Sequence, residues 1–331
     1  MRKLLFLPIA LASLTTISSA QTITQNFGSG ANAFSMDFVR IGNTDNEWNT
    51  TYNGEVAYIY NLGKYEVSRD MVLKAVTAGG LGLTLADMTG RNGDGNGANR
   101  PATGISWNEA ARFVNWLNTS KGYQAAYNFP TSGPNDNIAM WNIDRSSQLG
   151  TGWQGGVNRY RHKDAVYFLP SADEWVKGAY YDPNKEGGAG YWEYPTMSDT
   201  APNEVSGGTT AGTAVFNNKN GPADIFDAGG LSAYGTMAQG GNVYEWIETA
   251  QDGLNDLTGP TSSGEFRGLF GGDYYDEGWK MEIMTNSTWG GGLDPDAENF
   301  FGFRVAMIPE PSSLSLLALG GVVVALRRRR E

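Results

Sequence analysis

Glycine occurs throughout this chain, at 45 of its 331 positions. That share is close to twice the ~7% of average proteins. Because glycine is unfavourable inside helices and strands, such a chain is expected to have long irregular loops between few regular elements. Aromatic residues make up 12% of the sequence, which is ample for a packed core and excludes a disordered chain. The length allows one large domain or two small ones.

Short strands are expected where apolar, β-branched or aromatic residues gather. Met36 to Ile41 form the first apolar cluster, and VAYIYNLGKYEVS from Val56 has the composition of a strand. Further short strands are expected around residues 266–271 and 301–307. Residues 181–235 are rich in Gly, Pro, Asn and Thr, which predicts mostly loops.

Three helices are predicted from their start signals. Ser68 is an N-cap for apolar residues at helical spacing, and that helix ends at Gly79-Gly80. Two clearer helices begin with capping boxes, Ser106 with Glu109 and Ser171 with Glu174. Few helices, short strands and long loops together predict an irregular α+β domain.

The N-terminal end is typical of export. Arg2 and Lys3 precede an apolar stretch and the small residues Ser18-Ser19-Ala20, which is the pattern of a secretory signal peptide over residues 1–20. The small polar residues 21–35 then predict a flexible lead-in.

The C-terminal end predicts a short membrane stretch. An uncharged segment runs from Ser312 to Leu326, and four arginines follow it. It is shorter than the ~17–25 residues that span a bilayer. Flanking arginines can snorkel and the bilayer can thin, so a marginal span with cytoplasmic arginines is feasible.

Charge narrows the class of partner. Lys and Arg number 24 against 35 Asp and Glu, and both ends are net basic, so the part between them is more acidic still. This balance disfavours nucleic acid and anionic surfaces, and it suits cations, neutral glycans or basic proteins. Acidity that serves only solubility is the simpler explanation.

The chain has no cysteine and one histidine, His162. Disulfides, thiol nucleophiles, thiolate metal sites and multi-histidine metal sites are therefore excluded. A serine triad would have to use His162. That residue lies in the charged stretch RYRHKD, which is expected to be a solvated loop or an edge strand.

Four segments occur in a fixed order, RPATGISWNEAARFVNWLN, FLPSADEWVKGAYY, YGTMAQGGNVYEW and RGLFGGDYYD, with GFRVAM closing. Together they resemble the formylglycine-generating enzyme family, also called the sulfatase-modifying factor domain, over residues 36–307. The resemblance implies a compact, loop-rich α+β fold similar to C-type lectins.

The tail over residues 308–331 resembles a second element, the PEP-CTERM sorting signal. Pro309-Glu310-Pro311 stands before the apolar stretch and the terminal arginines. This resemblance implies export in a Gram-negative bacterium, transient anchoring in the inner membrane, and processing by an exosortase that leaves the protein at the cell surface or outside the cell. The alternative is a plain C-terminal anchor.

The family's enzymes bind copper through two cysteines that lie shortly after the arginine motif, here RGLFGGDY from Arg267. Counting on without gaps, those two positions fall near Asp276 and Met281. A soft thiolate copper site cannot be built from Asp and Met. Neither copper nor formylglycine formation by the family mechanism is therefore expected in this chain.

The same region predicts a ligand groove. Tyr274, Tyr275, Trp279 and Trp289 would form an aromatic wall around Asp276, suited to a glycan or a peptide. Paired carboxylates can also hydrolyse glycosides, so an enzyme with a repurposed acidic groove is one alternative. A structural protein without any ligand is another.

The stretch AQGGNVYEWIE, residues 238–248, resembles the structural calcium corner of the family. The resemblance assigns the Glu245 side chain and the backbone oxygens of Gly241 and Val243 as ligands, and such hard oxygens suit Ca²⁺. A fourth ligand position falls on Ala238, which offers no side-chain oxygen. The alternative is a hydrogen-bonded core corner without metal.

These observations together predict an exported, non-catalytic member of the family, with no nucleic acid partner. It would act as a binding or structural component of the cell envelope or of an extracellular matrix.

Overall fold

A five-stranded antiparallel sheet forms one side of the core. The computed structural model describes residues 22–49, 53–141, 158–253, 255, 257, 265–287, 291–293 and 296–309. The sheet has the order β1-β2-β3-β13-β4. Its strands are β1 (Thr22–Phe27), β2 (Phe34–Ile41), β3 (Tyr60–Gly63), β13 (Ala306–Met307) and β4 (Tyr167–Phe168). The last strand of the domain therefore pairs between strands from its beginning and its middle.

Residues 22–27 form β1, so the prediction of a flexible lead-in over residues 21–35 is wrong there. β1 pairs with β2 along its whole length. The Thr24 hydroxyl donates to Asp37 at 2.6 Å, and the Ser35 hydroxyl donates to Asn26 at 2.7 Å. An edge strand with one face in solvent accepts polar residues, which is why low hydrophobicity concealed it.

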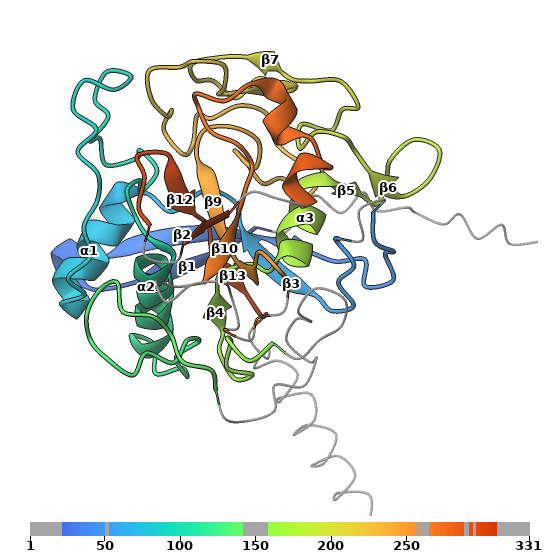
Figure 1. Cartoon of the computed structure of the whole chain (residues 1–331). Helices are drawn as coiled ribbons and strands as arrows, with labels where there is room; N and C mark the ends of the chain where they lie inside the picture. Colours follow the sequence, from blue (N-terminus) through green and yellow to red (C-terminus); the bar gives the residue numbers. More distant parts are fainter. Residues whose placement is uncertain are drawn as a thin grey trace, which may run out of the picture.

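A four-stranded sheet of order β11-β10-β9-β12 packs beside the first (Figure 1). Its strands are β9 (Tyr244–Ala250), β10 (Phe266–Phe270), β11 (Gly291–Leu293) and β12 (Phe301–Phe303). β12 runs parallel to β9, whereas β10 is antiparallel to both of its neighbours. The strand expected over residues 301–307 is thus two strands, and Arg304 lies between them, where the chain passes from one sheet to the other.

The three predicted helices are confirmed as α1 (Arg69–Gly79), α2 (Trp107–Thr119) and α3 (Ala172–Tyr180). Ser68 caps α1, and both predicted capping boxes are formed at α2 and α3. The start of α2 is joined to β9 by two indoles. Trp107 donates to the carbonyl of Ile247 and Trp246 to that of Ile105, each at 2.8 Å. This exchange of hydrogen bonds satisfies two buried carbonyl groups where helix and sheet meet.

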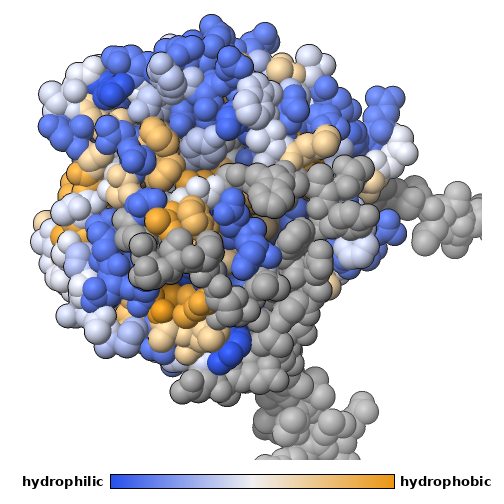
Figure 2. Space-filling view, viewed as in Figure 1, coloured by the Kyte–Doolittle hydropathy of each residue, from blue (hydrophilic) through white to orange (hydrophobic). Residues whose placement is uncertain are grey.

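Loops make up most of residues 181–235, as predicted. They contain only the two-residue strands β5 (Tyr181–Asp182), β6 (Gly190–Tyr191), β7 (Asn203–Glu204) and β8 (Thr213–Ala214). Short 3₁₀ helices are η1 (Gly30–Asn32), η4 (Gly278–Met281) and η5 (Thr285–Ser287). Figure 2 shows mainly hydrophilic residues at the top of the molecule, where Figure 1 places β7 and its loops.

The predicted signal peptide, residues 1–20, lies outside the described residues, as do residues 310–331 of the predicted sorting signal. Among the residues that are described, no helix has the length and apolar character needed to cross a bilayer.

Candidate functional site

A buried carboxylate lies where β9, α3 and the segment after β12 meet. Glu245 in β9 is fully buried. One of its oxygens accepts hydrogen bonds from the Trp175 indole at 2.6 Å and from Nε of Arg304, and the other accepts from Nη2 of Arg304. Arg304 also donates to the carbonyls of Gly63 and Met237, each at 2.9 Å. Two parallel charge-assisted bonds are a strong form of arginine–carboxylate pairing. Through Arg304, Glu245 in β9 is linked to β3 at Gly63 and to the loop before β9 at Met237.

A second carboxylate, Glu66, belongs to the same buried group. Its Oε2 accepts from the Asn242 side chain at 2.7 Å, whereas Oε1 has no hydrogen-bond partner among the described residues. Burial and the nearby charge of Glu245 raise the pKa of Glu66 well above its usual value, and Arg304 opposes that shift. Two acids therefore share one guanidinium, and Glu66 is held toward its protonated form.

The hydrogen bonds on Glu245 bear on whether its side chain can hold calcium. Both Glu245 oxygens are occupied by Trp175 and Arg304, and the guanidinium supplies the positive charge that an ion would bring. Ala238 adds no oxygen. As they stand, the side chains do not fit a calcium ion on Glu245. The site assigned to Glu245, Gly241 and Val243 stays a prediction that the donor set does not favour.

Gly241 is required at this corner for steric reasons. Its φ is +79°, and a Cβ there would lie 2.3 Å from the Val215 carbonyl oxygen. We expect Gly241→Ala to lower the free energy of unfolding by about 2–4 kcal/mol, since left-handed strain and a backbone clash add together. Gly42→Ala is the matched control, because no atom lies within 4 Å of its Cβ position. Urea denaturation of both variants measures the difference, and equal stabilities would contradict this account.

The predicted ligand groove falls on the loop after β10, and its residues separate into two groups. Tyr275 and Trp279 are 63% and 50% exposed, whereas Tyr274 is buried in a cluster with Val243. Trp289 lies outside the described residues. The structure therefore presents two of the predicted aromatic side chains to solvent and commits a third to packing.

Asp273 shapes this loop. It is buried, and its Oδ1 accepts from the backbone N–H groups of Tyr275 at 2.6 Å and Asp276 at 3.1 Å. Burial and the charge of Asp276 raise the pKa of Asp273 to about 6. Two further acids are engaged by indole and phenol groups, Glu277 by Trp279 and Glu282 by Tyr194.

Asp276 and Met281, which an ungapped count places near the two expected cysteine positions, have different surroundings. Asp276 is half-buried, and its Oδ2 accepts from the backbone of Asp273 at 3.3 Å. Met281 is 1% exposed and packs in an apolar cluster with Tyr194 and Phe216. A methionine that fills core volume and an aspartate that closes a turn offer no soft metal site.

A second buried ion network was missed by the sequence reasoning. Arg161, from the stretch RYRHKD, is 1% exposed and pairs with Glu174 at 3.2 Å and Glu248 at 2.9 Å. Tyr58 also donates to Glu174. Burial raises the pKa of Glu248 to about 7. His162 is buried beside Arg161, so the expectation of a solvated stretch is wrong there. A charged segment is therefore not always exposed, because buried acids elsewhere in the fold can pair with its basic residues. Here those acids come from α3 and β9.

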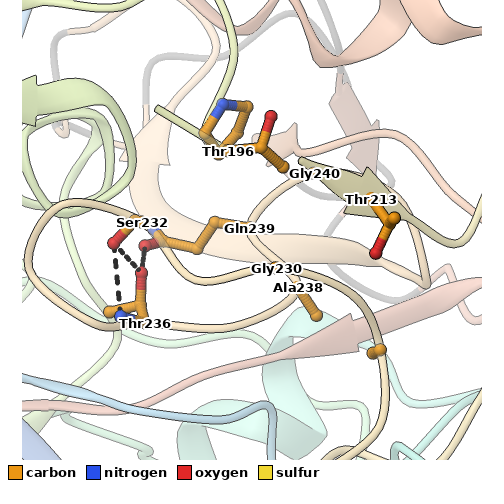
Figure 3. A pocket seen from close by; sticks show the side chains of 10 residues that line it. Thr196, Thr213, Gly230, Ser232, Thr236, Ala238, Gln239 and Gly240 are labelled. Carbon is orange, nitrogen blue, oxygen red and sulfur yellow. Dashed lines mark hydrogen bonds between the residues drawn. The ribbon is translucent and has the colours of Figure 1, made fainter. Parts of the chain in front are cut away.

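A small cavity of about 10 Å³ lies beside Ala238 (Figure 3). Ser232 and Thr236 share a hydrogen bond of 2.7 Å next to it, and Thr236 donates to Gln239. The Thr196 hydroxyl, also on the wall, has no hydrogen-bond partner among the described residues. A cavity of this size fits about one water molecule. Its hydroxyl lining suits water, and the space is too small for an organic ligand.

Solved structures match nearly the whole chain at low sequence identity. CarF is 16% identical, with a TM-score of 0.50 over 88% of this chain and 99% of that one. Treponema denticola variable protein 1 is 17% identical, with 0.48 over 87% and 99%. PvdO from Pseudomonas aeruginosa is 16% identical, with 0.46 over 86% and 98%. Such likeness concerns the fold alone. Among curated proteins, none gives a significant match.

Two family models match the sequence. The PEP-CTERM protein-sorting motif matches residues 308–330, which marks an exported protein with transient membrane anchoring. The sulfatase-modifying factor enzyme 1-like domain matches residues 31–308, and this match confirms both the predicted family and its α+β fold. The likeness to C-type lectins stays a prediction. The chain belongs to the FGE-sulfatase family, as a member with no cysteine and a C-terminal sorting motif.

Proposed function

We propose that this protein is a non-catalytic binding component of the cell envelope or of an extracellular matrix. One observation carries the proposal: the family scaffold is kept while the chain has no cysteine, and Met281, near one of the two counted cysteine positions, is buried in packing. The family's copper chemistry requires two thiolates, and no residue of this chain can supply one. The scaffold is then left with the role of presenting a surface.

The surface that we propose for binding is the loop of residues 273–287. It carries Tyr275, Trp279 and Met284, which are 63%, 50% and 61% exposed. Exposed aromatic side chains on a loop held by a rigid core are typical of recognition sites. The backbone of residues 274–276 is fixed by hydrogen bonds from residues 217–219, so the loop is pre-organised. A glycan or a peptide is the class of ligand that such a surface suits.

Hydrolysis is the weaker alternative. A glycosidase needs two carboxylates that face each other across the scissile bond. Asp273 is used by backbone N–H groups, and Glu277 and Glu282 are engaged by Trp279 and Tyr194. These acids stabilise the loop, and none of these contacts leaves a facing pair.

Catalysis and binding are tested together on the full chain. With copper and a sulfatase-type cysteine peptide we expect no formylglycine product, because the thiolates are missing. On arrays of glycans and peptides we expect a ligand whose affinity falls about tenfold in Trp279→Ala, since one buried aromatic contact is worth about 1–2 kcal/mol. Trp48→Ala is the matched control, as Trp48 is similarly exposed at 55% and comes from the loop after β2.

Three outcomes separate the functions. Turnover of the cysteine peptide would overturn the non-catalytic assignment. Cleavage of an arrayed glycan that is lost in Asp276→Asn would favour the hydrolase. Absence of any ligand on both arrays would favour a purely structural protein.

The sorting motif supports delivery to the envelope. We propose exosortase as the processing partner, with final placement at the cell surface or outside the cell. Replacing the four terminal arginines of the motif should leave the protein unprocessed, which immunoblotting of membrane and culture fractions measures.

A further inference from the structure

The largest cavity that we describe lies away from the loop of residues 273–287. It has a volume of about 490 Å³ and opens between the end of α1, one face of α2 and residues 125–141. Figure 1 places α1 and α2 at the left, whereas η4 and η5 lie at the upper right beside α3. This volume is within the range of small-molecule sites, about 300–1,000 Å³. We name it the α1–α2 cavity.

Aromatic side chains form much of its wall. Trp116 lies directly on the backbone of Gly79, where an added Cβ would be 2.4 Å from the indole. Phe129 has the Arg112 guanidinium 3.8 Å from its ring centroid. Trp141 is half-buried and donates to the carbonyl of Ala126 at 2.9 Å. These contacts fix the rings, so the wall is rigid before any ligand arrives.

Several polar groups on the same wall have no partner in the part of the chain that the structure describes. They are the indole N–H of Trp116, the carboxamide of Asn128 and the hydroxyl of Ser132. Arg112 uses Nε and Nη2 to hold the carbonyls of Pro134 and Thr131, each at 3.1 Å. Donors and an acceptor thus stand beside aromatic side chains and are open to water. Such groups lose little by turning from water to a ligand hydroxyl.

The lining also limits the chemistry of a ligand. Arg112 is the one charged side chain among the lining residues, and no carboxylate lines the cavity. An anion would meet a single cation in a chain of formal charge −11, and a cation would meet no acid. None of the lining residues belongs to a strand, so a peptide has no sheet edge to extend.

From these observations we infer that the α1–α2 cavity binds a neutral saccharide unit, with its apolar face against the half-buried Trp141 and its hydroxyls on Asn128 and the Trp116 N–H. A sugar ring combines apolar C–H faces with equatorial donors and acceptors, which matches this lining. The inference does not depend on the proposed function, because it uses other residues on another part of the surface.

The test is saturation-transfer NMR and calorimetry with the full chain. The probes are neutral tetrasaccharides of glucose, xylose, mannose and N-acetylglucosamine at about 10 mM, a range that detects millimolar binding. At least one should bind. Asn128→Ala and Trp116→Phe should each weaken it about three- to tenfold, since each removes one hydrogen bond to the ligand. The melting temperature should be unchanged in Asn128→Ala, because its carboxamide bonds to no described residue. Trp116→Phe should lower it, because the indole packs against Phe34 and Phe113, so binding by that variant is measured well below its melting temperature.

The Trp279→Ala variant tests whether the two sites are distinct. It should leave saccharide binding to the α1–α2 cavity unaltered. Binding that is lost in Trp279→Ala but kept in Asn128→Ala would move the saccharide to the loop of residues 273–287 and overturn the inference. Absence of binding by all four probes would also overturn it, whatever the arrays report for that loop.

Discussion

Replacing Arg304 by methionine is expected to lower the free energy of unfolding by about 3–5 kcal/mol, as is typical when one partner of a buried ion pair is removed. Glu245 and Glu66 would then both be buried without the guanidinium between them. The carbonyls of Gly63 and Met237 would also lose their donor. Urea denaturation followed by tryptophan fluorescence measures the loss.

A surface ion pair gives the control. Lys74 and Asp70 lie one turn apart on α1 at 2.7 Å and are partly exposed, so Lys74→Met should cost less than about 1 kcal/mol. If Arg304→Met prevents folding, Glu245→Gln is the milder variant, because the amide keeps the shape and loses the charge. An Arg304→Met protein as stable as the Lys74→Met protein would refute the importance of this corner.

The same proteins decide the calcium question. With Arg304 paired to Glu245, addition or chelation of Ca²⁺ should leave the melting temperature of the wild type unchanged. An ion that binds only the folded state must raise that temperature. A clear rise that disappears in Glu245→Gln would show that Glu245 is a ligand after all.

The second large effect is expected at Arg161. Arg161→Met leaves Glu174 and Glu248 buried without a cation, and we expect a loss of about 3–5 kcal/mol at pH 8. Burial already raises the pKa of Glu248 to about 7, above its usual 4.5. A folded-state pKa above the unfolded one means that the folded state gains stability as the pH falls from about 7 to 4.5.

The cost of Arg161→Met should therefore be smaller at pH 5 than at pH 8, because a protonated Glu248 no longer needs the cation. Urea denaturation of variant and wild type at both pH values measures this difference. Comparing the pair at each pH cancels the titration of other groups. A cost that stays equal at both pH values would show that Glu248 keeps its charge in the variant.

The sequence predicted the elements whose signals are local. Ser106 and Ser171 mark their helices because a capping box lies within four residues. The segments of the family motifs were enough to predict the fold class. β1 was missed because an edge strand needs few apolar residues, and the break at Arg304 was missed because only pairing with distant strands divides residues 301–307.

The buried ion networks could not be predicted for a related reason. Arg161 contacts Glu174 and Glu248 only after α3 and β9 have packed. No feature near RYRHKD in the sequence indicates these partners. At the candidate site the sequence predicted Tyr275 and Trp279 on one loop, but it gave no sign that the adjacent Tyr274 turns inward. Alternation of side chains in an irregular loop follows the surrounding contacts and has no fixed period.

The position of β13 bears on when the protein can fold. This strand pairs with β3 and β4 inside the five-stranded sheet, and Ile308, where the sorting motif begins, follows it directly. β12 likewise completes the other sheet against β9. Neither sheet can close before residues 301–307 have been synthesised and are free to pair, so the domain can complete its fold only when nearly its whole length is available. A force on the tail would act directly on an interior strand. Whether the tail is anchored or free therefore decides whether such a force reaches the whole domain.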